Sequence, residues 1–395
     1  MSEDPIVVVG MARTPMGGMQ GALGAVPAYE LGATAIKAAL EDAGVNGGDI
    51  DETLMGCVLP AGQGQAPARQ ASKGAGIPDA TGAVTVNKMC GSGMKTMMMA
   101  HDSILAGTND VCVAGGMESM TNAPHMLVGA RNGYRYGHTT VYDHMAMDGL
   151  EDAYDRGKAM GVFAEETARK YQFTREQQDA YAIESVGRAR RAIDDGSFDG
   201  EVTPVTVKTR KGEIIVDTDE QPGKAMPEKI PNLRPAFAKD GTVTAASSSS
   251  ISDGAAALVL MRQSEAEKRG LTPIAAIRAH ASHSHQPEWF TTAPVGAIEK
   301  VLDKAGWSKD DVDLFEINEA FAVVTMAAMK EFSLDHDKVN VNGGACALGH
   351  PIGASGARIS VTLLNALRKR GLKRGVATLC IGGGEATALA MELMD

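Results

Sequence analysis

The stretch YELGATAIKAALEDAGVNGGDIDETLMG, residues 29–56, carries the pattern that decides the fold. Its apolar residues recur at the spacing of an amphipathic helix, and the pattern stops at Gly44, a residue type that commonly terminates helices. A short polar turn leads into residues 51–56, which are typical of a hydrophobic strand. The stretch VGAIEKVLDKAGWSKDDVDLFE, residues 295–316, repeats this order, so the sequence predicts two similar halves.

The parallel between the halves continues beyond these stretches. Cys90 follows Gly44 by 46 residues, and His350 follows Gly306 by 44 residues. Each is followed by a predicted helix and then by an apolar strand that runs into glycines; the helices are expected over 93–106 and 355–370, and the strands over 110–116 and 376–383. Alternating strands and helices with short connections predict a layered α/β fold. A two-fold relation between the halves would bring the turns at Cys90 and His350 to one central site.

The middle of the chain differs from both halves. Residues 120–245 hold most of the tyrosines, scattered charges and proline-rich turns. One helix is predicted from Thr174 to Ala192, with Thr174 as N-cap and Gln177 close to completing a capping box. We expect an inserted loop domain that carries substrate contacts. The predicted organisation is a first half over 1–120, completed by 246–272, a loop domain over 121–245 and a second half over 273–395.

The chain returns to the core through a run of four serines, residues 247–250. Residues 241–246 and 253–260 on either side are typical of strands. This setting favours a tight wall of small residues over a flexible linker.

Composition and charge limit the classes of function. The chain has 395 residues, 44% of them hydrophobic, and a formal net charge of −11 with a pI near 5.4, which argues against nucleic acid as the main partner. Anionic ligands remain possible through local lysines and helix N-termini. A strand pattern begins at Ile6, leaving no room for a targeting segment, and no apolar run approaches the roughly 20 residues that cross a bilayer. The five cysteines show neither zinc spacing nor a disulfide framework, so we expect a reduced, soluble, cytoplasmic protein.

Cys90 is the first candidate catalytic residue. It follows the strand-like residues 84–86 and precedes a helix that is expected to begin near Ser92. The positive end of a helix dipole lowers the pKa of a nearby thiol, so the sequence predicts a thiolate nucleophile. Cys57 and Cys112 lie in apolar strand patterns and are typical of small buried cysteines.

A histidine and a second thiol complete the predicted site. His350 is enclosed by glycine and proline, and a neutral imidazole there is suited to take a thiol proton and then to donate to an oxyanion. Asn318 follows a strand directly and is placed to hold a water or the histidine, whereas Glu319 is expected to be paired inside. Cys380 precedes glycines 382–384, whose N–H groups suggest an oxyanion hole. Two such thiols indicate one that attacks carbon and one that moves a proton.

Eight sequence blocks in order resemble those of the thiolases, the acetyl-CoA C-acyltransferases, over nearly the full chain. The blocks are Asn87–Gly93, Gly115–Met120, Met160–Gly161 with Ala164–Glu165, Arg175–Ala182, Gly241–Ala257, Asn318–Ala322, Asn342–Gly356 and Cys380–Gly384. The resemblance implies a duplicated, five-layered αβαβα thiolase fold with a loop domain, and a homodimer or homotetramer.

The resemblance also implies roles for the site residues. Cys90 is similar to the nucleophile that becomes acyl-cysteine, and His350 to the residue that activates it and, with a water on Asn318, stabilises the thioester oxygen of the second substrate. Cys380 is similar to the acid/base at the α-carbon, and the N–H groups of Cys90 and Gly382 to the other oxyanion hole. The positions that resemble the pantetheine and acyl pocket are Met160, Ala236, Phe237, Ala245, Ser249, Ala320 and Phe321.

The implied reaction is a reversible, ping-pong Claisen condensation and thiolysis. Two acetyl-CoA molecules, or acetyl-CoA and an acyl-CoA, would exchange with a 3-ketoacyl-CoA through an acyl-cysteine. The coenzyme A thioesters are substrates, and no other cofactor, metal, nucleic acid or membrane is implied. The alternative is a 3-ketoacyl-CoA thiolase of broader chain length in fatty-acid degradation.

Four features depart from the common pattern of short-chain thiolases. Ala159 stands where histidine is frequent, the usual Gly-Asn-Ala-Ser-Gly reads Ala-Ser-Ser-Ser-Ser over 246–250, and Phe163 and Cys346 replace more usual residues. These differences touch the substrate pocket rather than the proton-transfer residues, so they bear on chain length and leave the mechanism unchanged.

Three other functions fit parts of the pattern. A ketoacyl-carrier-protein synthase of the same fold uses histidine in place of the second cysteine, so Cys380 argues against it. A cysteine hydrolase with a dyad of Cys90 and His350 would pass its acyl group mainly to water rather than to coenzyme A. A non-enzymatic lipid-binding or scaffolding member would lack one of the four polar catalytic candidates. All four are present: Cys90, Asn318, His350 and Cys380.

Overall fold

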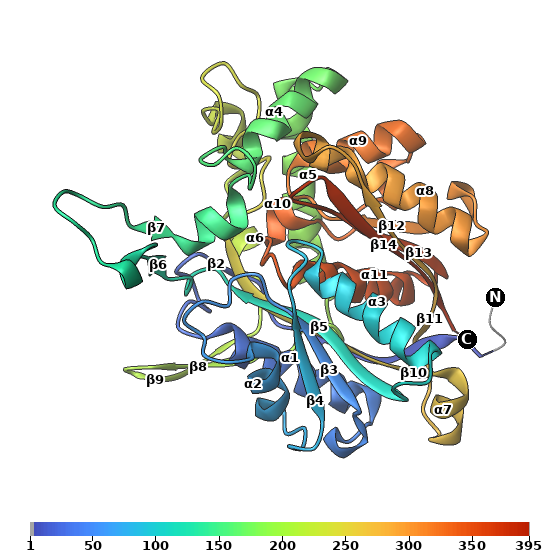
Figure 1. Cartoon of the computed structure of the whole chain (residues 1–395). Helices are drawn as coiled ribbons and strands as arrows, with labels where there is room; N and C mark the ends of the chain where they lie inside the picture. Colours follow the sequence, from blue (N-terminus) through green and yellow to red (C-terminus); the bar gives the residue numbers. More distant parts are fainter. Residues whose placement is uncertain (1–3, 395) are drawn as a thin grey trace.

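In the computed structural model, which describes residues 4–394, the two repeats form two matching sets of strands that meet side by side (Figure 1). In space the order is β4-β3-β5-β10-β1 for the first half, continued by β11-β14-β13-β12 for the second. The strands of the two sets are β1 (Ile6–Arg13), β3 (Glu52–Gly56), β4 (Gly82–Val86), β5 (Val111–Ser119), β10 (Ser252–Arg262), β11 (Ala275–Ser284), β12 (Leu314–Ile317), β13 (Arg374–Ile381) and β14 (Glu385–Leu393), and β2 (Gly17–Gly18) pairs with β10.

The strand pairings show the same duplication. β3 is parallel to β5, which is followed in space by antiparallel β10 and β1. In the second half β12 is parallel to β13, which is followed by antiparallel β14 and β11. The halves join through a short antiparallel contact of β1 with β11. The prediction of two similar halves is confirmed.

Helices separate and cover these strands in five layers. α1 (Ala28–Ala43) and α2 (Pro67–Gly74) pack on the outer face of the first set, and α8 (Ala293–Ala305) packs on the outer face of the second. α3 (Ser92–Leu105) and α11 (Ser355–Arg370) lie together between the two sets. Each space between neighbouring layers is filled by hydrophobic side chains, so the predicted αβαβα fold is confirmed.

β10 shows why these strands lack polar alternation. Ala255, Ala257, Val259 and Met261 face α1, whereas Ala256, Leu258 and Leu260 face the central helices. Successive side chains of a strand point to opposite faces, and here both faces are buried. The strand therefore forms a continuous apolar run.

The two repeated helices end in the same way. α1 is followed by Gly44 at φ 65°, and α8 by Gly306 at φ 68°, both in the left-handed region that glycine adopts without strain. A short capped turn follows each, Gly47–Asp49 and Lys309–Asp311. The sequence repeat is thus a repeat of local structure.

The inserted region contains the predicted helix. α5 (Arg175–Asp194) is capped by Thr174, and Gln177 completes the capping box as expected. The other elements there are β6 (His125–Met126), β7 (Tyr142–Asp143), α4 (Met160–Tyr171), β8 (Val205–Thr209), β9 (Gly212–Val216), α6 (Glu220–Lys224), the π-helix Ala146–Leu150 and the short turns Ala130–Asn132 and Pro227–Asn232. The β6–β7 and β8–β9 arms extend away from the body of the molecule (Figure 1). The domain boundaries at 120, 245 and 272 stay predictions.

Residues 241–246 do not form the strand expected from sequence. Their backbone is held instead by a buried carboxylate, because Glu165 accepts hydrogen bonds from the N–H groups of Thr242 and Val243. Ser247 and Ser248 are buried, and Ser249 bonds to the backbone of Ala320, which fits a packed wall rather than a linker.

The remaining helices connect the second half. They are α7 (Gln263–Lys268), α9 (Ala322–Phe332), α10 (Ala345–Leu348) and the short turns Pro287–Thr292 and His336–Lys338. Between residues 4 and 394, no helix combines the length and apolar character needed to cross a membrane.

Candidate active site

Two glycines bring the turns at Cys90 and His350 together. A Cβ added to Gly93 would lie 2.8 Å from the backbone N of Ala357, and one added to Gly356 would lie 2.4 Å from the backbone N of Met94. The first turns of α3 and α11 therefore touch backbone to backbone, which only glycine permits. The predicted meeting of the two turns at the centre follows from this contact.

Cys90 lies in a constrained turn just before α3. Met89, the preceding residue, has φ 47°, a left-handed conformation that is uncommon for a non-glycine residue. A Cβ on Gly91 would come within 2.3 Å of the Ile381 side chain, so the turn is packed directly against the end of β13. The turn thus places the sulfur beside the second cysteine segment.

The expected lowering of the Cys90 pKa is wrong. Burial raises the pKa of the thiol to about 11, although N–H groups of Gly382 and of Cys90 itself favour the thiolate, and the charge of Glu118 raises it further. Desolvation disfavours the charged form and here exceeds the benefit of the donors. Cys90 is therefore a thiol at neutral pH and needs a base to become a nucleophile.

Cys380 lies fully buried near the end of β13. Burial raises its pKa well above that of a free thiol, and the neighbouring Cys90 raises it further. The N–H of Gly382, two residues on, points toward the Cys90 sulfur. The two thiols and this donor therefore share one site.

His350 is held by serine at one ring nitrogen. Its Nδ1 lies 2.5 Å from the Oγ of Ser355, and that hydroxyl donates its proton to the carbonyl of Pro351 at 2.9 Å. The imidazole must then donate from Nδ1, which leaves the lone pair on Nε2. Nε2 is buried and has no hydrogen-bond partner among residues 4–394. The unpartnered ring nitrogen is thus the basic one.

The imidazole is also kept neutral. Burial and then the positive charge of Arg358 lower the pKa of His350 to about 3. The neutral form predicted from sequence therefore holds throughout the physiological pH range.

Asn318 lies against the same ring. Its Nδ2 is 3.4 Å from Nδ1 of His350, a contact too long and wrongly paired for a hydrogen bond when Nδ1 carries the proton. Its Oδ1 is buried without a partner in the described part of the chain. The amide oxygen is thus free to accept a hydrogen bond from a water, and the amide nitrogen is free to donate one.

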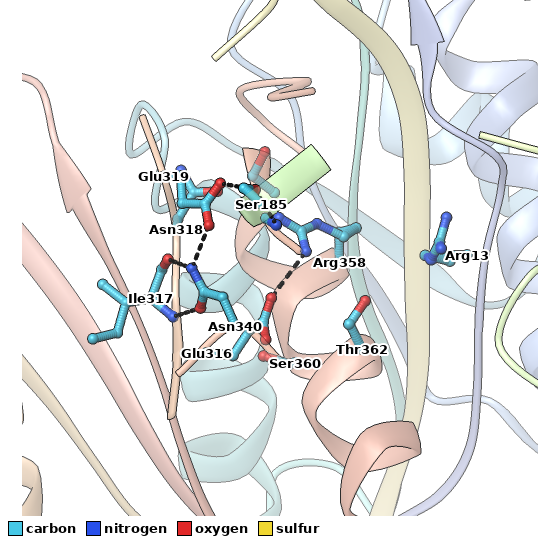
Figure 2. Close-up of polar contacts among 12 residues, drawn as sticks. Arg13, Ser185, Glu316, Ile317, Asn318, Glu319, Asn340, Arg358, Ser360 and Thr362 are labelled. Carbon is cyan, nitrogen blue, oxygen red and sulfur yellow. Dashed lines mark hydrogen bonds and ion pairs between the residues drawn. The ribbon is translucent and has the colours of Figure 1, made fainter. Parts of the chain in front are cut away.

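A buried polar network holds the residues on either side of Asn318, Ile317 and Glu319 (Figure 2). Glu319 accepts hydrogen bonds from Tyr181 and Ser185 of α5 and from Asn340, whose side chain also bonds to both backbone groups of Ile317. Glu319 is therefore paired inside, as predicted, and it ties the loop region to the end of β12.

A second pair lies beside this network. Arg358 donates to Glu316 at 3.2 Å, and both side chains are buried (Figure 2). This guanidinium supplies the charge that opposes protonation of His350.

Four of the seven predicted pocket residues pack in one cluster with Cys380. Met160, Phe237, Ala320 and Phe321 belong to one apolar cluster with Cys380, and the Met160 side chain approaches Gly382. Ser249 donates to the carbonyl of Ala320 at 3.0 Å, and Ala236 donates to Val243 at 2.9 Å beside Phe237. Ala245 lines a cavity of about 380 Å³, as do Ser248, Ser250 and Cys346.

Sequence reasoning missed two polar residues at the site, Ser355 and Glu118. Ser355 lies five residues after His350, in the first turn of α11. A serine there usually hydrogen-bonds to the backbone of its own helix, so the sequence does not single it out. Glu118 is the buried acid of β5. The glutamate in an otherwise apolar strand was the available signal, because buried acids need partners.

Replacing Ser355 with alanine is expected to slow acylation of Cys90 about 10- to 100-fold, because the imidazole loses the contact that fixes its tautomer. Rapid-quench acetylation measures this rate. Ser360→Ala is the matched control, since Ser360 bonds to the carbonyl of Gly356 on the same helix in the same way. Equal rates for the two variants would contradict the assignment.

Comparison with known proteins agrees with this geometry. Family models described as thiolase N-terminal and C-terminal domains match residues 6–264 and 271–393. The chain is 49% identical to acetyl-CoA acetyltransferase of Chromobacterium violaceum, over 98% of this chain and 99% of that protein, and 46% identical to a probable acetyl-CoA acyltransferase of Staphylococcus aureus, over 98% of each.

Solved structures are similar over the whole chain. The crystal structure of the Bacillus anthracis acetyl-CoA acetyltransferase matches with a TM-score of 0.96 at 40% identity, covering 99% of both chains. The Acat5 thiolase from Ascaris suum in complex with coenzyme A matches with a TM-score of 0.93 at 41% identity, covering 99% of this chain and all of that one.

Proposed function

The chain belongs to the thiolase family, and on that premise we propose that it condenses two molecules of acetyl-CoA to acetoacetyl-CoA and catalyses the reverse thiolysis. The observation that carries the proposal is the shared site of two neighbouring thiols, one of which faces the N–H of Gly382.

The first half-reaction forms acetyl-Cys90. Nε2 of His350 takes the proton of Cys90, and the sulfur attacks the thioester carbon of acetyl-CoA. The N–H groups of Cys90 and Gly382 stabilise the oxyanion, and coenzyme A leaves with the proton from His350. The raised pKa of Cys90 supports this order, because the thiol needs a base at the moment of attack.

The second half-reaction forms the carbon–carbon bond. Nε2 of His350 takes the proton of Cys380, and the Cys380 thiolate removes an α-proton from the second acetyl-CoA. The protonated His350 and a water on Asn318 donate hydrogen bonds to the enolate oxygen. The α-carbon attacks acetyl-Cys90, and the Cys90 sulfur leaves as a thiolate that takes the proton back from His350. The unpartnered Nε2 and Oδ1 support this role, because Nε2 can accept a proton and Oδ1 can hold the water. In thiolysis, Cys380 returns the proton to carbon.

The cavity lined by Ala245 supports binding of coenzyme A. Ser250, on its wall, accepts a hydrogen bond from the backbone N–H of His350, so the cavity adjoins the site. Lys229 lies at the same cavity and supplies positive charge for phosphates, whereas Lys224, also at the cavity, is in an ion pair with Glu220. We infer that coenzyme A thioesters are the substrates and that no further cofactor is needed.

The acyl pocket favours the shortest substrate. The rings of Phe163, Phe290 and Phe321 are buried and pack edge to face beside Cys380. We expect kcat/KM for thiolysis to fall at least about 10-fold from the C4 to the C8 3-ketoacyl-CoA, since each unaccommodated methylene costs binding. Thiolysis kinetics from C4 to C12 measure this. A preference for C8 to C12 would support the alternative, a thiolase of broader chain length in fatty-acid metabolism.

We also propose a cytoplasmic homotetramer. The β6–β7 arm exposes several large apolar side chains, Leu127, Val128, Tyr134, Tyr136, Val141 and Tyr142. Exposed apolar patches of this kind support burial of the arm against another copy of the chain. The exposed edge strand β4 offers a second surface, through which two copies would pair as the homodimer within the tetramer. All five cysteines are free, which supports a reducing compartment.

A further inference from the structure

Glu118, at the carboxyl end of β5, binds backbone from both halves of the molecule. Its Oε2 accepts hydrogen bonds from the N–H of Val58 at 2.9 Å and of Gly353 at 2.8 Å. Its Oε1 accepts from the N–H of Leu59 at 3.1 Å and from the thiol of Cys57 at 3.5 Å. The side chain has no exposed surface. Every oxygen of this buried acid is therefore occupied by a donor.

The donors connect the two catalytic turns. Val58 and Leu59 follow β3 and pack in one apolar cluster with Met89 and Cys90. Gly353 belongs to the turn that carries His350, three residues earlier in the chain. The carboxylate thus bridges the surroundings of the nucleophile and the loop of the base.

The Glu118 carboxylate, the end of β5 and the His350 turn are tightly packed. A Cβ on Gly353 would lie 2.5 Å from Oε2 of Glu118, and one on Gly116 would lie 2.1 Å from the carbonyl of Gly353. The end of β5 and the His350 turn are therefore in backbone contact. A small change at Glu118 must move one of the two turns.

We propose that Glu118 is a positioning residue of the thiolase reaction: its carboxylate holds the His350 turn against the Cys90 half and places a negative charge near the nucleophile. The inference rests on the proposed function, because the chemistry of Cys90 and His350 gives the contact its purpose.

The electrostatics agree with the geometry. Burial raises the pKa of Glu118 to about 7, against the opposing effect of the three N–H donors, so the carboxylate is ionised above neutral pH. Its charge is one of the causes that raise the pKa of Cys90. The other titratable groups around this region are the thiols of Cys57 and Cys380 and the imidazole of His350, all of which are neutral at that pH because burial disfavours their charged forms.

The test is Glu118→Gln. An amide presents a donor where backbone N–H groups need an acceptor, so at least one hydrogen bond is lost. We expect condensation turnover to fall about 10- to 100-fold, the effect of a small misplacement of catalytic groups. We also expect alkylation of Cys90 by iodoacetamide, followed by peptide mapping, to reach its midpoint at lower pH, because the neighbouring negative charge is gone.

Two variants separate charge from contact. Gly353→Ala keeps the carboxylate but places a methyl against it, so it is expected to lower turnover without lowering the Cys90 midpoint. Asp51→Asn is the matched control, since Asp51 holds the N–H groups of Asp110 and Val111 at the other end of β5. It is expected to leave the midpoint unchanged.

The outcomes are distinguishable. Wild-type turnover in folded Glu118→Gln, or an alkylation midpoint that does not fall, overturns the proposal. If Glu118→Gln does not fold, Glu118→Asp decides, because it keeps the charge on a shorter arm; wild-type turnover in that variant also overturns it. Failure of the proposed thiolase function is distinguishable from failure of the Glu118 proposal, because the unmodified protein would then show no condensation.

Discussion

Replacing Cys90 with alanine is expected to lower condensation and thiolysis by at least about 10⁴-fold, as for other nucleophiles that act as part of a unit. Without the sulfur no acyl-enzyme forms, and both directions of the reaction pass through that intermediate. Radiolabelled acetyl-CoA measures the step directly, and Cys90→Ala is expected to take up no label.

A second cysteine provides the control for this variant. Cys112 is a buried cysteine that lies in β5 and contacts Ser103 rather than the site. Cys112→Ala is expected to acetylate at the wild-type rate. Label that persists on another residue of Cys90→Ala would refute the role of Cys90.

Replacing Cys380 with serine is expected to separate the two half-reactions. Cys90 is still acetylated, because His350 and the N–H of Gly382 are untouched. Exchange of the α-protons of acetyl-CoA with deuterated water is expected to fall at least about 10³-fold, because a serine hydroxyl is a far weaker acid than a thiol and does not supply the anion. Mass spectrometry of recovered acetyl-CoA measures the exchange.

Cys112→Ser is the matched control here, since it makes the same replacement at a buried thiol outside the site. It is expected to exchange normally. Unimpaired exchange in Cys380→Ser would reject Cys380 as the base at carbon.

Much of the fold was predictable from local pattern. The glycines that end α1 and α8 and the capped turns after them act within a few residues, so the repeat is visible in the sequence alone. The strand expected over 241–246 was wrong because a distant side chain, Glu165, binds that backbone and replaces a strand partner.

The electrostatics of the site were less predictable. The turn before α3 suggested a low pKa for Cys90, but the depth of burial is set by the packing of β13 and the second half, which a local pattern does not contain. The same holds for Ser355 and Glu118. Their importance lies in what they contact, at Nδ1 of His350 and at the N–H of Gly353.

The two thiols have unequal roles in a duplicated scaffold. Cys90 belongs to the first half, and the structural counterpart of its turn carries His350 rather than a third thiol. Cys380 lies on β13, the counterpart of β5. The Cys90 thiol therefore attacks the thioester carbon, and the Cys380 thiol transfers the α-proton.

The most direct test is to trap the acyl-enzyme of the unmodified protein with labelled acetyl-CoA, map the label by peptide analysis and chase it with coenzyme A. We expect label on Cys90 that returns to coenzyme A as acetyl-CoA. Label on Cys380, or label that passes to water faster than to coenzyme A, would contradict the roles assigned to the two thiols.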